Sequence, residues 1–196
     1  MPRLLLLNGP PGIGKSTLAR RYVQDRPLAF CLDIDGFRRL LGRWSEHEKE
    51  SGLLARAMAL EMARVHLQGG RDVVVPQFVA QVEFIEELRG VAADAGAAFV
   101  EVVLMDSRSS AVARFETRRH DPEAAVHHRE AAQMAGGPAG LSQMYDRLEA
   151  LLAERPGAIV VRTRSGEPDA AYRDLLAAIG DPPPETPTSG KPEGAR

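Results

Sequence analysis

The sequence is poor in several features that would place a chain in a specialised class. It has one cysteine, Cys31, among 196 residues, so no disulfide framework stabilises it and a buried thiol in a reducing compartment is expected. A formal net charge of −2 gives no general attraction to nucleic acid or to a membrane surface. No apolar run approaches the roughly 20 residues of a membrane span. These absences predict a soluble, cytoplasmic protein with no membrane partner.

What the sequence has instead is an alternation of strand and helix patterns. Apolar runs typical of buried strands lie at residues 3–7, 28–32, 71–75, 98–105 and 158–161. Helical spacing occurs between and after them, at residues 15–24, 35–41, 53–68, 79–88, 107–119, 141–151 and 168–179. This alternation predicts an α/β fold with a parallel sheet covered by helices on both faces. In the helix at 53–68 the polar residues share one arc, so its apolar remainder is expected to pack on the sheet.

A glycine-rich motif separates the first strand from the first helix. It matches G-x-x-x-x-G-K-[ST], the Walker A pattern of a phosphate-binding loop, and consists of Gly9, Pro10, Pro11, Gly12, Ile13, Gly14, Lys15 and Ser16. Glycines let the backbone curl so that N–H groups converge on phosphate oxygens, and the following helix N-terminus adds partial positive charge. We expect Lys15 to reach the β- and γ-phosphates, Ser16 to ligate Mg²⁺, and Thr17 to belong to the same nucleotide site. The predicted ligand is ATP, or GTP, with Mg²⁺.

Two carboxylates, Asp33 and Asp35, follow the second predicted strand. In an open α/β sheet, ligands bind at the carboxyl ends of the strands, and phosphoryl transfer needs a group that takes the proton of the attacking hydroxyl. If the strand continued through both residues they would point in opposite directions, so we expect different roles for them. The alternative is that one of the two caps the following helix.

The loop and the segment at residues 32–41 together resemble the small P-loop kinases that phosphorylate hydroxyl groups. This group includes chloramphenicol phosphotransferase, the tunicamycin-resistance and capuramycin phosphotransferase proteins, and the kinase domain of polynucleotide kinase. The resemblance covers about residues 1–180 and implies a three-layer P-loop kinase fold with a five-stranded parallel sheet in the order 2-3-1-4-5. It also implies a helical lid at about residues 107–140. Residues 181–196, rich in Pro, Gly and Thr, are expected to form a disordered tail.

The resemblance also implies roles for particular residues. Asp35 and Arg38 match the D-x-x-R spacing of polynucleotide kinase, in which the carboxylate is the general base and the arginine orients the acceptor. Asp33 aligns instead with the base of chloramphenicol phosphotransferase. We favour Asp35 as the base and place Asp33 nearer the metal. In many P-loop enzymes an acidic residue that helps to bind Mg²⁺ follows the strand next to the loop strand. In this sequence Gln77 is at that position, so the second protein contact to the metal is expected to be Asp33, with Asp106 as the alternative.

The remaining candidates surround the nucleotide and the acceptor. In the resembled kinases, lid arginines close over the triphosphate, and Arg114, Arg118 and Arg119 occupy that part of this chain, with Arg118 assigned a catalytic role. By analogy of fold, Arg164 after the fifth strand is placed near the adenine. The residues proposed to contact the acceptor, besides the two carboxylates and Arg38, are Trp44, Gln77 and Phe78. For Trp44 a position in the core is the alternative.

These residues lead to three functional hypotheses. The first is an ATP-dependent phosphotransferase acting on a hydroxyl of a small molecule, with a nucleoside-type antibiotic as the favoured acceptor and resistance as the outcome. The second keeps the chemistry but takes a 5′-hydroxyl of nucleic acid, which the near-neutral charge disfavours without excluding. The third is a nucleotide-dependent switch or ATPase. The oligomeric state is open between monomer and homodimer.

Overall fold

The computed structural model describes residues 1–108, 110, 113 and 137–182 of the chain. Most of the expected lid and nearly all of the expected tail fall outside this range. The three predicted lid arginines, Arg114, Arg118 and Arg119, therefore lie outside the described residues.

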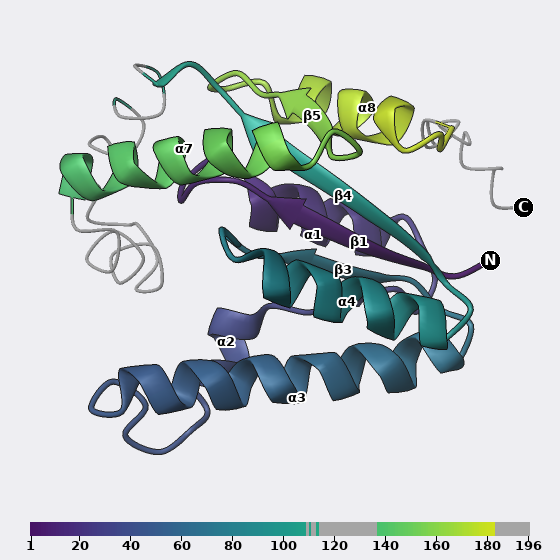
Figure 1. Ribbon diagram of the computed structural model, residues 1–196. Coiled ribbons are helices and arrows are strands. Elements are labelled where there is room, and N and C mark those ends of the chain that lie inside the picture. The colour runs from purple at the N-terminus through teal and green to yellow at the C-terminus, as the bar shows by residue number, and fades with distance from the viewer. Residues whose placement is uncertain (109, 111–112, 114–136, 183–196) are drawn as a thin grey trace, which may run out of the picture.

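A five-stranded parallel sheet forms the middle layer of the molecule (Figure 1). Its strands are β1 (Arg3–Asn8), β2 (Phe30–Cys31), β3 (Val73–Pro76), β4 (Ala98–Met105) and β5 (Ile159–Arg162). They pair in the order β2-β3-β1-β4-β5, which confirms the expected fold class and strand order. The central strand β1 is a continuous run of leucines because both faces of a parallel sheet are covered by helices.

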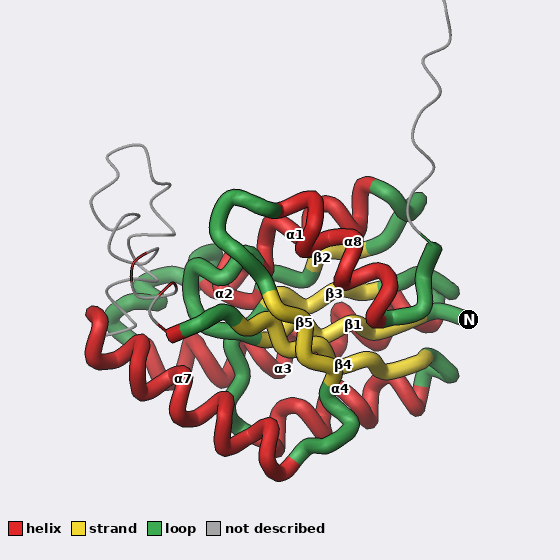
Figure 2. The backbone as a smooth tube through the Cα atoms, turned by 90° about the horizontal axis from the view of Figure 1, so that it is seen from above, coloured by secondary structure: helices red, strands yellow, loops and turns green. Residues whose placement is uncertain are grey.

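Helices cover both faces of the sheet, as Figure 2 shows from above. They are α1 (Lys15–Gln24), α2 (Ile34–Arg38), α3 (Glu48–Gln68), α4 (Val82–Asp94), α7 (Gly137–Glu154) and α8 (Pro168–Ala178). Alternate residues of β1 divide the core in two. Leu5 and Leu7 pack with α1 and α8, whereas Leu4 and Leu6 pack with α3, α4 and α7. Among the described helices, none is long and apolar enough to cross a bilayer.

The second strand is shorter than the apolar run suggested. Leu28, expected in the strand, follows Pro27 and has a φ of 61°, in the left-handed region that interrupts an extended strand. The ladder is therefore limited to Phe30 and Cys31, and helix α2 begins at Ile34 rather than Asp35. The strand does not continue through Asp33 and Asp35, because Asp35 already lies within helix α2.

Helix α7 begins earlier than expected. The helical spacing predicts a start near residue 141, whereas α7 begins at Gly137 and Pro138 is its second residue. A proline costs nothing there because the first N–H groups of a helix have no intrahelical acceptor.

Helix α3 differs from the sequence expectation in how much of it is buried. The buried residues of the helix form a narrow stripe that consists of Ser51, Ala55, Ala59, Ala63 and Leu67, and Leu60 packs partly buried beside it. The expected packing of the whole apolar remainder is wrong, because five large apolar side chains are exposed: Leu53, Leu54, Met58, Met62 and Val65. The inner positions recur every four residues and are mostly alanine, so the contact with the core is close but narrow.

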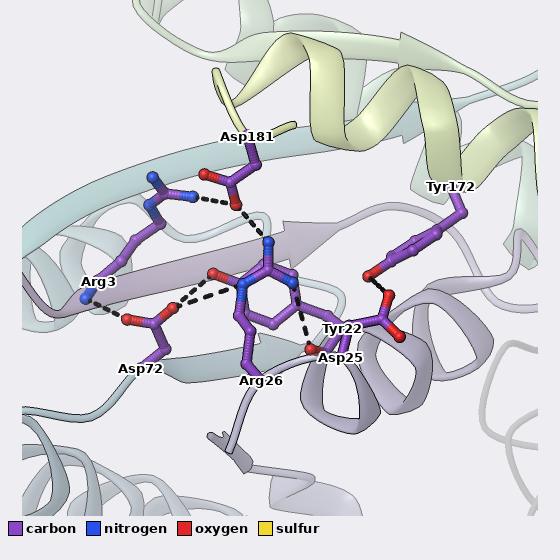
Figure 3. A network of polar contacts seen from close by, with 7 residues as sticks. All are labelled: Arg3, Tyr22, Asp25, Arg26, Asp72, Tyr172 and Asp181. Atoms are coloured by element: carbon purple, nitrogen blue, oxygen red, sulfur yellow. Dashed lines mark hydrogen bonds and ion pairs between the residues drawn. The ribbon is translucent and has the colours of Figure 1, made fainter. Parts of the chain in front are cut away.

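A network of polar contacts lies at the edge of the sheet where the strands begin (Figure 3). Asp72, just before β3, accepts hydrogen bonds from the backbone N–H of Arg3 (2.9 Å) and the hydroxyl of Tyr22 (2.7 Å). Asp181, just after α8, accepts from the guanidinium groups of Arg3 (2.9 Å) and Arg26. The network thus joins the start of β1, the end of α1 and the segment after α8.

Candidate active site

The loop after β1 has the backbone geometry of a phosphate-binding loop. Gly9, Gly12 and Gly14 have φ values of 149°, 79° and 109°, in the region that favours glycine. A Cβ on Gly9 would lie 2.7 Å from the carbonyl oxygen of Leu104, so a larger residue would displace the loop from β4. The glycines of the motif are therefore required by conformation, and at Gly9 also by space.

The N-terminus of α1 is free to interact with an anion. Gly14 occupies the N-cap position, no side chain among the described residues caps the helix, and its first turn contains no acidic residue. Backbone N–H groups at such an end have no intrahelical acceptor and carry the positive end of the helix dipole. Ser16 is half-buried in this first turn and Thr17, beside it, is exposed. The arrangement matches the expected triphosphate site.

Lys15 lies folded against its own loop. Its Nζ donates hydrogen bonds to the carbonyl oxygens of Gly9 (2.7 Å) and Pro10 (2.9 Å). Burial of the amine lowers the pKa of Lys15 to about 8, and the nearby Asp35 carboxylate partly opposes that shift. Asp35 is also linked to this part of the chain by hydrogen bonds, because it bonds to Gln77, whose backbone N–H donates to the carbonyl oxygen of Leu7, two residues before the phosphate loop, at 3.1 Å.

Asp35 is held by a residue from the neighbouring strand. Gln77, directly after β3, donates from Nε2 to Oδ2 of Asp35 at 3.2 Å. Because a carboxylate only accepts, this contact fixes which end of the amide faces Asp35. The other amide atom, Oε1 of Gln77, is buried and has no hydrogen-bond donor among the described residues.

Asp33 has a different role. It is the N-cap of α2, and its exposed carboxylate accepts a hydrogen bond from the backbone N–H of Gly36 at 3.0 Å. The alternative that one of the two carboxylates caps the helix therefore describes Asp33. Its assignment to the metal remains a prediction.

Arg38 connects the acidic motif to α3. The side chain is buried, Nε donates to Oγ of Ser51 at 3.0 Å, and Nη2 donates to the carbonyl oxygen of Glu48. The guanidinium carbon lies 5.2 Å from the ring centroid of Trp44, which is half-buried. Arg38 therefore fixes α2, and Asp35 one turn earlier, to the start of α3.

Phe78, another residue proposed to contact the acceptor, packs partly buried against the core.

One residue of the site was not found from the sequence. Asn8, the last residue of β1, is fully buried, and its Oδ1 accepts from the backbone N–H groups of Gly9 (2.8 Å) and Val79 (2.9 Å). Its Nδ2 donates to the carbonyl oxygen of Val79 at 2.7 Å. Asn8 thus joins the phosphate loop to the segment that carries Gln77. The sequence does contain one signal for this residue, because Asn8 is a polar residue at the end of an otherwise apolar strand.

Two further candidates lie beyond β4 and β5. Asp106 follows β4, and its Oδ1 accepts from the backbone N–H of Ser107 at 2.6 Å. Arg164, placed near the adenine by analogy, is exposed and lies 3.8 Å from a carboxylate oxygen of Glu167. The nucleotide role of Arg164 stays a prediction.

The site fits Mg²⁺ only in combination with a nucleotide. Within the described part of the chain, no three acidic, histidine or cysteine side chains gather closely enough to hold a metal by themselves. Ser16 lies beside the predicted phosphate position, and Mg²⁺ in kinase sites is bound by few protein ligands together with phosphate oxygens and water. Ser16 with the triphosphate is therefore the donor set that the residues support.

The strand order and the glycine-rich loop define the class of this protein as a P-loop fold of the kinase type. The chain belongs to the AAA_33 family, described as an AAA domain, which matches residues 4–137. The expected resemblance is confirmed at this level. No match was found among curated proteins.

Solved structures share the fold at low sequence identity. The gluconokinase of Sinorhizobium meliloti 1021 is 17% identical with a TM-score of 0.62, covering 91% of this chain and 92% of its own. The tunicamycin resistance protein of Deinococcus radiodurans is 17% identical with a TM-score of 0.58, covering 93% and 100%. The Mycobacterium tuberculosis APS kinase in complex with AMPPNP and APS is 19% identical with a TM-score of 0.57, covering 92% and 98%.

Proposed function

We propose that this protein transfers the γ-phosphoryl group of ATP to a hydroxyl of a small molecule in the cytoplasm. The observation that carries the proposal is the position of Asp35. Its carboxylate is held by Gln77, whose backbone N–H bonds the carbonyl oxygen of Leu7 near the end of β1, just before the phosphate loop. A proton acceptor beside a phosphate loop is what hydroxyl phosphorylation requires.

In the proposed reaction, the loop N–H groups, the N-terminus of α1 and Lys15 bind the triphosphate. The oxygen of the acceptor hydroxyl forms a bond to the γ-phosphorus while Asp35 takes the hydroxyl proton. The bond between the γ-phosphorus and the bridging β–γ oxygen breaks, and ADP leaves. Lys15 leaves its carbonyl partners and stabilises negative charge on the transferring group. Mg²⁺, when bound beside Ser16, neutralises phosphate charge. Arg114, Arg118 and Arg119 are proposed to complete this neutralisation from the lid.

The acceptor is proposed to be polyhydroxylated, with a nucleoside-type antibiotic tested first. The buried Oε1 of Gln77 lacks a donor among the described residues, and an unsatisfied buried acceptor costs about 1–3 kcal/mol. A second hydroxyl of the acceptor is suited to supply that donor. The fold similarity to a tunicamycin resistance protein, spanning 93% of this chain, supports the choice of antibiotic class. Resistance by phosphorylation is the corresponding biological proposal.

Nucleic acid is the less favoured acceptor. The basic side chains beside the acidic motif interact within the protein, because Arg38 is buried against α3 and Arg43 pairs with Glu46. These two arginines are therefore already partnered, which weakens the case for a positive groove along a polynucleotide.

A screen for phosphorylated product tests the proposal. The protein is incubated with ATP, Mg²⁺ and panels of hydroxylated antibiotics, nucleosides and short oligonucleotides, and products heavier by one phosphate are sought by mass spectrometry. Lys15→Ala is expected to lose turnover by about 10²-fold or more, while Lys49→Ala, an exposed lysine on α3, is expected to match the parent. Phosphorylation of oligonucleotides alone would favour the second hypothesis. ATP hydrolysis with no phosphorylated acceptor would favour the third.

A further inference from the structure

Helix α3 presents an apolar surface that nothing in the described part of the chain covers. Leu54, Met58, Met62 and Val65, hereafter the α3 stripe, are 51%, 39%, 38% and 69% exposed. At 100° per residue these four positions lie within an arc of about 80°, so they form one line along the helix. Figure 1 shows α3 at the outer margin of the molecule, with α2 and α4 on its inner side.

The stripe is large for a surface left in contact with water. Four side chains of these types at these exposures present roughly 400 Å² of mostly apolar area, within the range of the largest patches on typical monomers, which are often functional. Apolar atoms form roughly 60% of a protein interface, so such a stripe corresponds to about 700 Å² on each partner. Two such surfaces give about 1,400 Å², within the range of specific complexes.

The order of residues in the stripe suits pairing with a copy of itself. In a two-fold antiparallel arrangement centred near residue 60, Leu54 of one copy lies opposite Val65 of the other, and Met58 lies opposite Met62. These contacts between the four stripe residues of the two copies are then apolar against apolar.

The charges around the stripe are arranged to favour the same pairing. Glu50, one turn before Leu54, is exposed in the acidic first turn, and Arg71 is exposed just beyond the last turn. In the antiparallel arrangement Glu50 faces position 70 of the other copy, beside Arg71. A parallel arrangement would instead place each charge next to its own counterpart, with repulsion at both ends.

We propose that the α3 stripe is the contact surface of a homodimer in which two copies of α3 pack antiparallel. The phosphate loop and the acidic motif lie outside this surface, so each copy keeps its own complete site. The inference does not depend on the identity of the acceptor. A homodimer is in equilibrium with its monomer, so the extent of assembly depends on protein concentration.

Sedimentation velocity over about 1 µM to 1 mM tests the proposal. The full chain, with a mass of 21.3 kDa, is expected to shift from monomer to dimer across that range. Met58→Glu and Val65→Glu are each expected to weaken the dimer by about 100-fold or more, because each buries a charge against an apolar partner. Leu53→Glu is the matched control. Leu53 is 58% exposed on the same helix but lies about 100° away from Leu54, so its replacement is expected to leave the dimer intact.

A charge exchange tests the orientation. Glu50→Lys and Arg71→Glu are each expected to weaken the dimer by about threefold to tenfold, and the double variant is expected to recover much of the loss. A parent chain that stays monomeric at 1 mM, or a dimer that Met58→Glu leaves unchanged, would overturn the proposal. A monomeric parent in which Met58→Glu also lowers Tm would show instead that the stripe is covered by the chain itself.

Discussion

Asp33 and Asp35 are chemically identical and two positions apart, yet their surroundings give them different tasks. The backbone turns into helix between them, so Asp33 caps α2 while Asp35 meets Gln77. A sequence pattern could place two carboxylates after a strand. It could not show how short the strand is, because the left-handed Leu28 delays its start and helix α2 begins at Ile34.

Amide substitutions distinguish the two carboxylates. Asp35→Asn keeps the shape and an acceptor for Gln77 but no longer takes a proton, so kcat is expected to fall by about 10²–10⁴-fold with little change in the KM for ATP. If Asp33 only caps α2, Asp33→Asn is expected to keep kcat within a few-fold and to leave Tm unchanged, since asparagine caps a helix as well as aspartate; a contact of Asp33 with Mg²⁺ would instead make kcat fall. Steady-state kinetics and thermal unfolding check both. A large loss in Asp33→Asn with activity retained in Asp35→Asn would reverse the assignment.

The lowered pKa of Lys15 predicts a pH dependence of nucleotide binding. The free amine has a pKa of about 8, and a bound triphosphate favours the charged form and raises that pKa. Below pH 8 the amine is already charged before the nucleotide binds, so the titration of Lys15 does not change the affinity with pH. Above pH 8 it must take up a proton, so affinity is expected to fall by up to about tenfold per pH unit.

Calorimetry with a non-hydrolysable ATP analogue, in buffers of different ionisation enthalpy, measures this proton uptake. Lys15→Arg is the control, because arginine stays charged throughout the range and should show no such decline. An unchanged affinity of the parent between pH 8 and 10 would contradict the prediction.

At the scale of elements, the site is a junction between segments far apart in the chain. Asn8 joins the end of β1 to Val79, Gln77 joins the end of β3 to Asp35, and Arg38 joins α2 to α3. The strand order followed from the phosphate loop and the family resemblance. These cross-links did not, because each depends on which side chains the folded chain brings together. The outer face of α3 was missed for the same reason, since periodicity shows that a helix has an apolar side but not what lies against it.

Replacement of Asn8 tests the junction. Asn8→Ala removes three hydrogen bonds and leaves buried backbone groups of Gly9 and Val79 without partners. The free energy of unfolding is expected to fall by about 2–4 kcal/mol, and the KM for ATP is expected to rise because the loop is less well fixed. Denaturant titration and kinetics measure the two effects.

The matched control is Gln81→Ala, which lies in the connection between β3 and α4 to which Asn8 is hydrogen-bonded. It removes one exposed contact with Arg56 and is expected to change stability by no more than about 0.5 kcal/mol. Equal effects of the two substitutions would show that Asn8 has no special role in fixing the loop.

At the scale of the whole molecule, the sheet separates two tasks. Its strand ends carry the phosphate loop and the acidic motif, while the strand beginnings carry the network of Figure 3. In that network, burial first and then the hydrogen bond to Asp25 raise the pKa of Tyr172 to about 12, so its hydroxyl remains a donor at neutral pH. The contacts of this network therefore lie at the opposite edge of the sheet from the groups that must rearrange around a substrate.

The hydrogen bond between Arg3 and Asp181 has a practical consequence for rearranging the gene. Because the side chains of these two residues meet at 2.9 Å, the first strand begins close to where the last helix ends. A circular permutant that joins residue 182 to residue 2 by a short glycine-serine linker, and opens at the exposed Gly69-Gly70 turn, is expected to fold and to bind ATP like the parent. Circular dichroism and calorimetry check this, and a permutant that fails to fold would show that this order of elements is needed for folding.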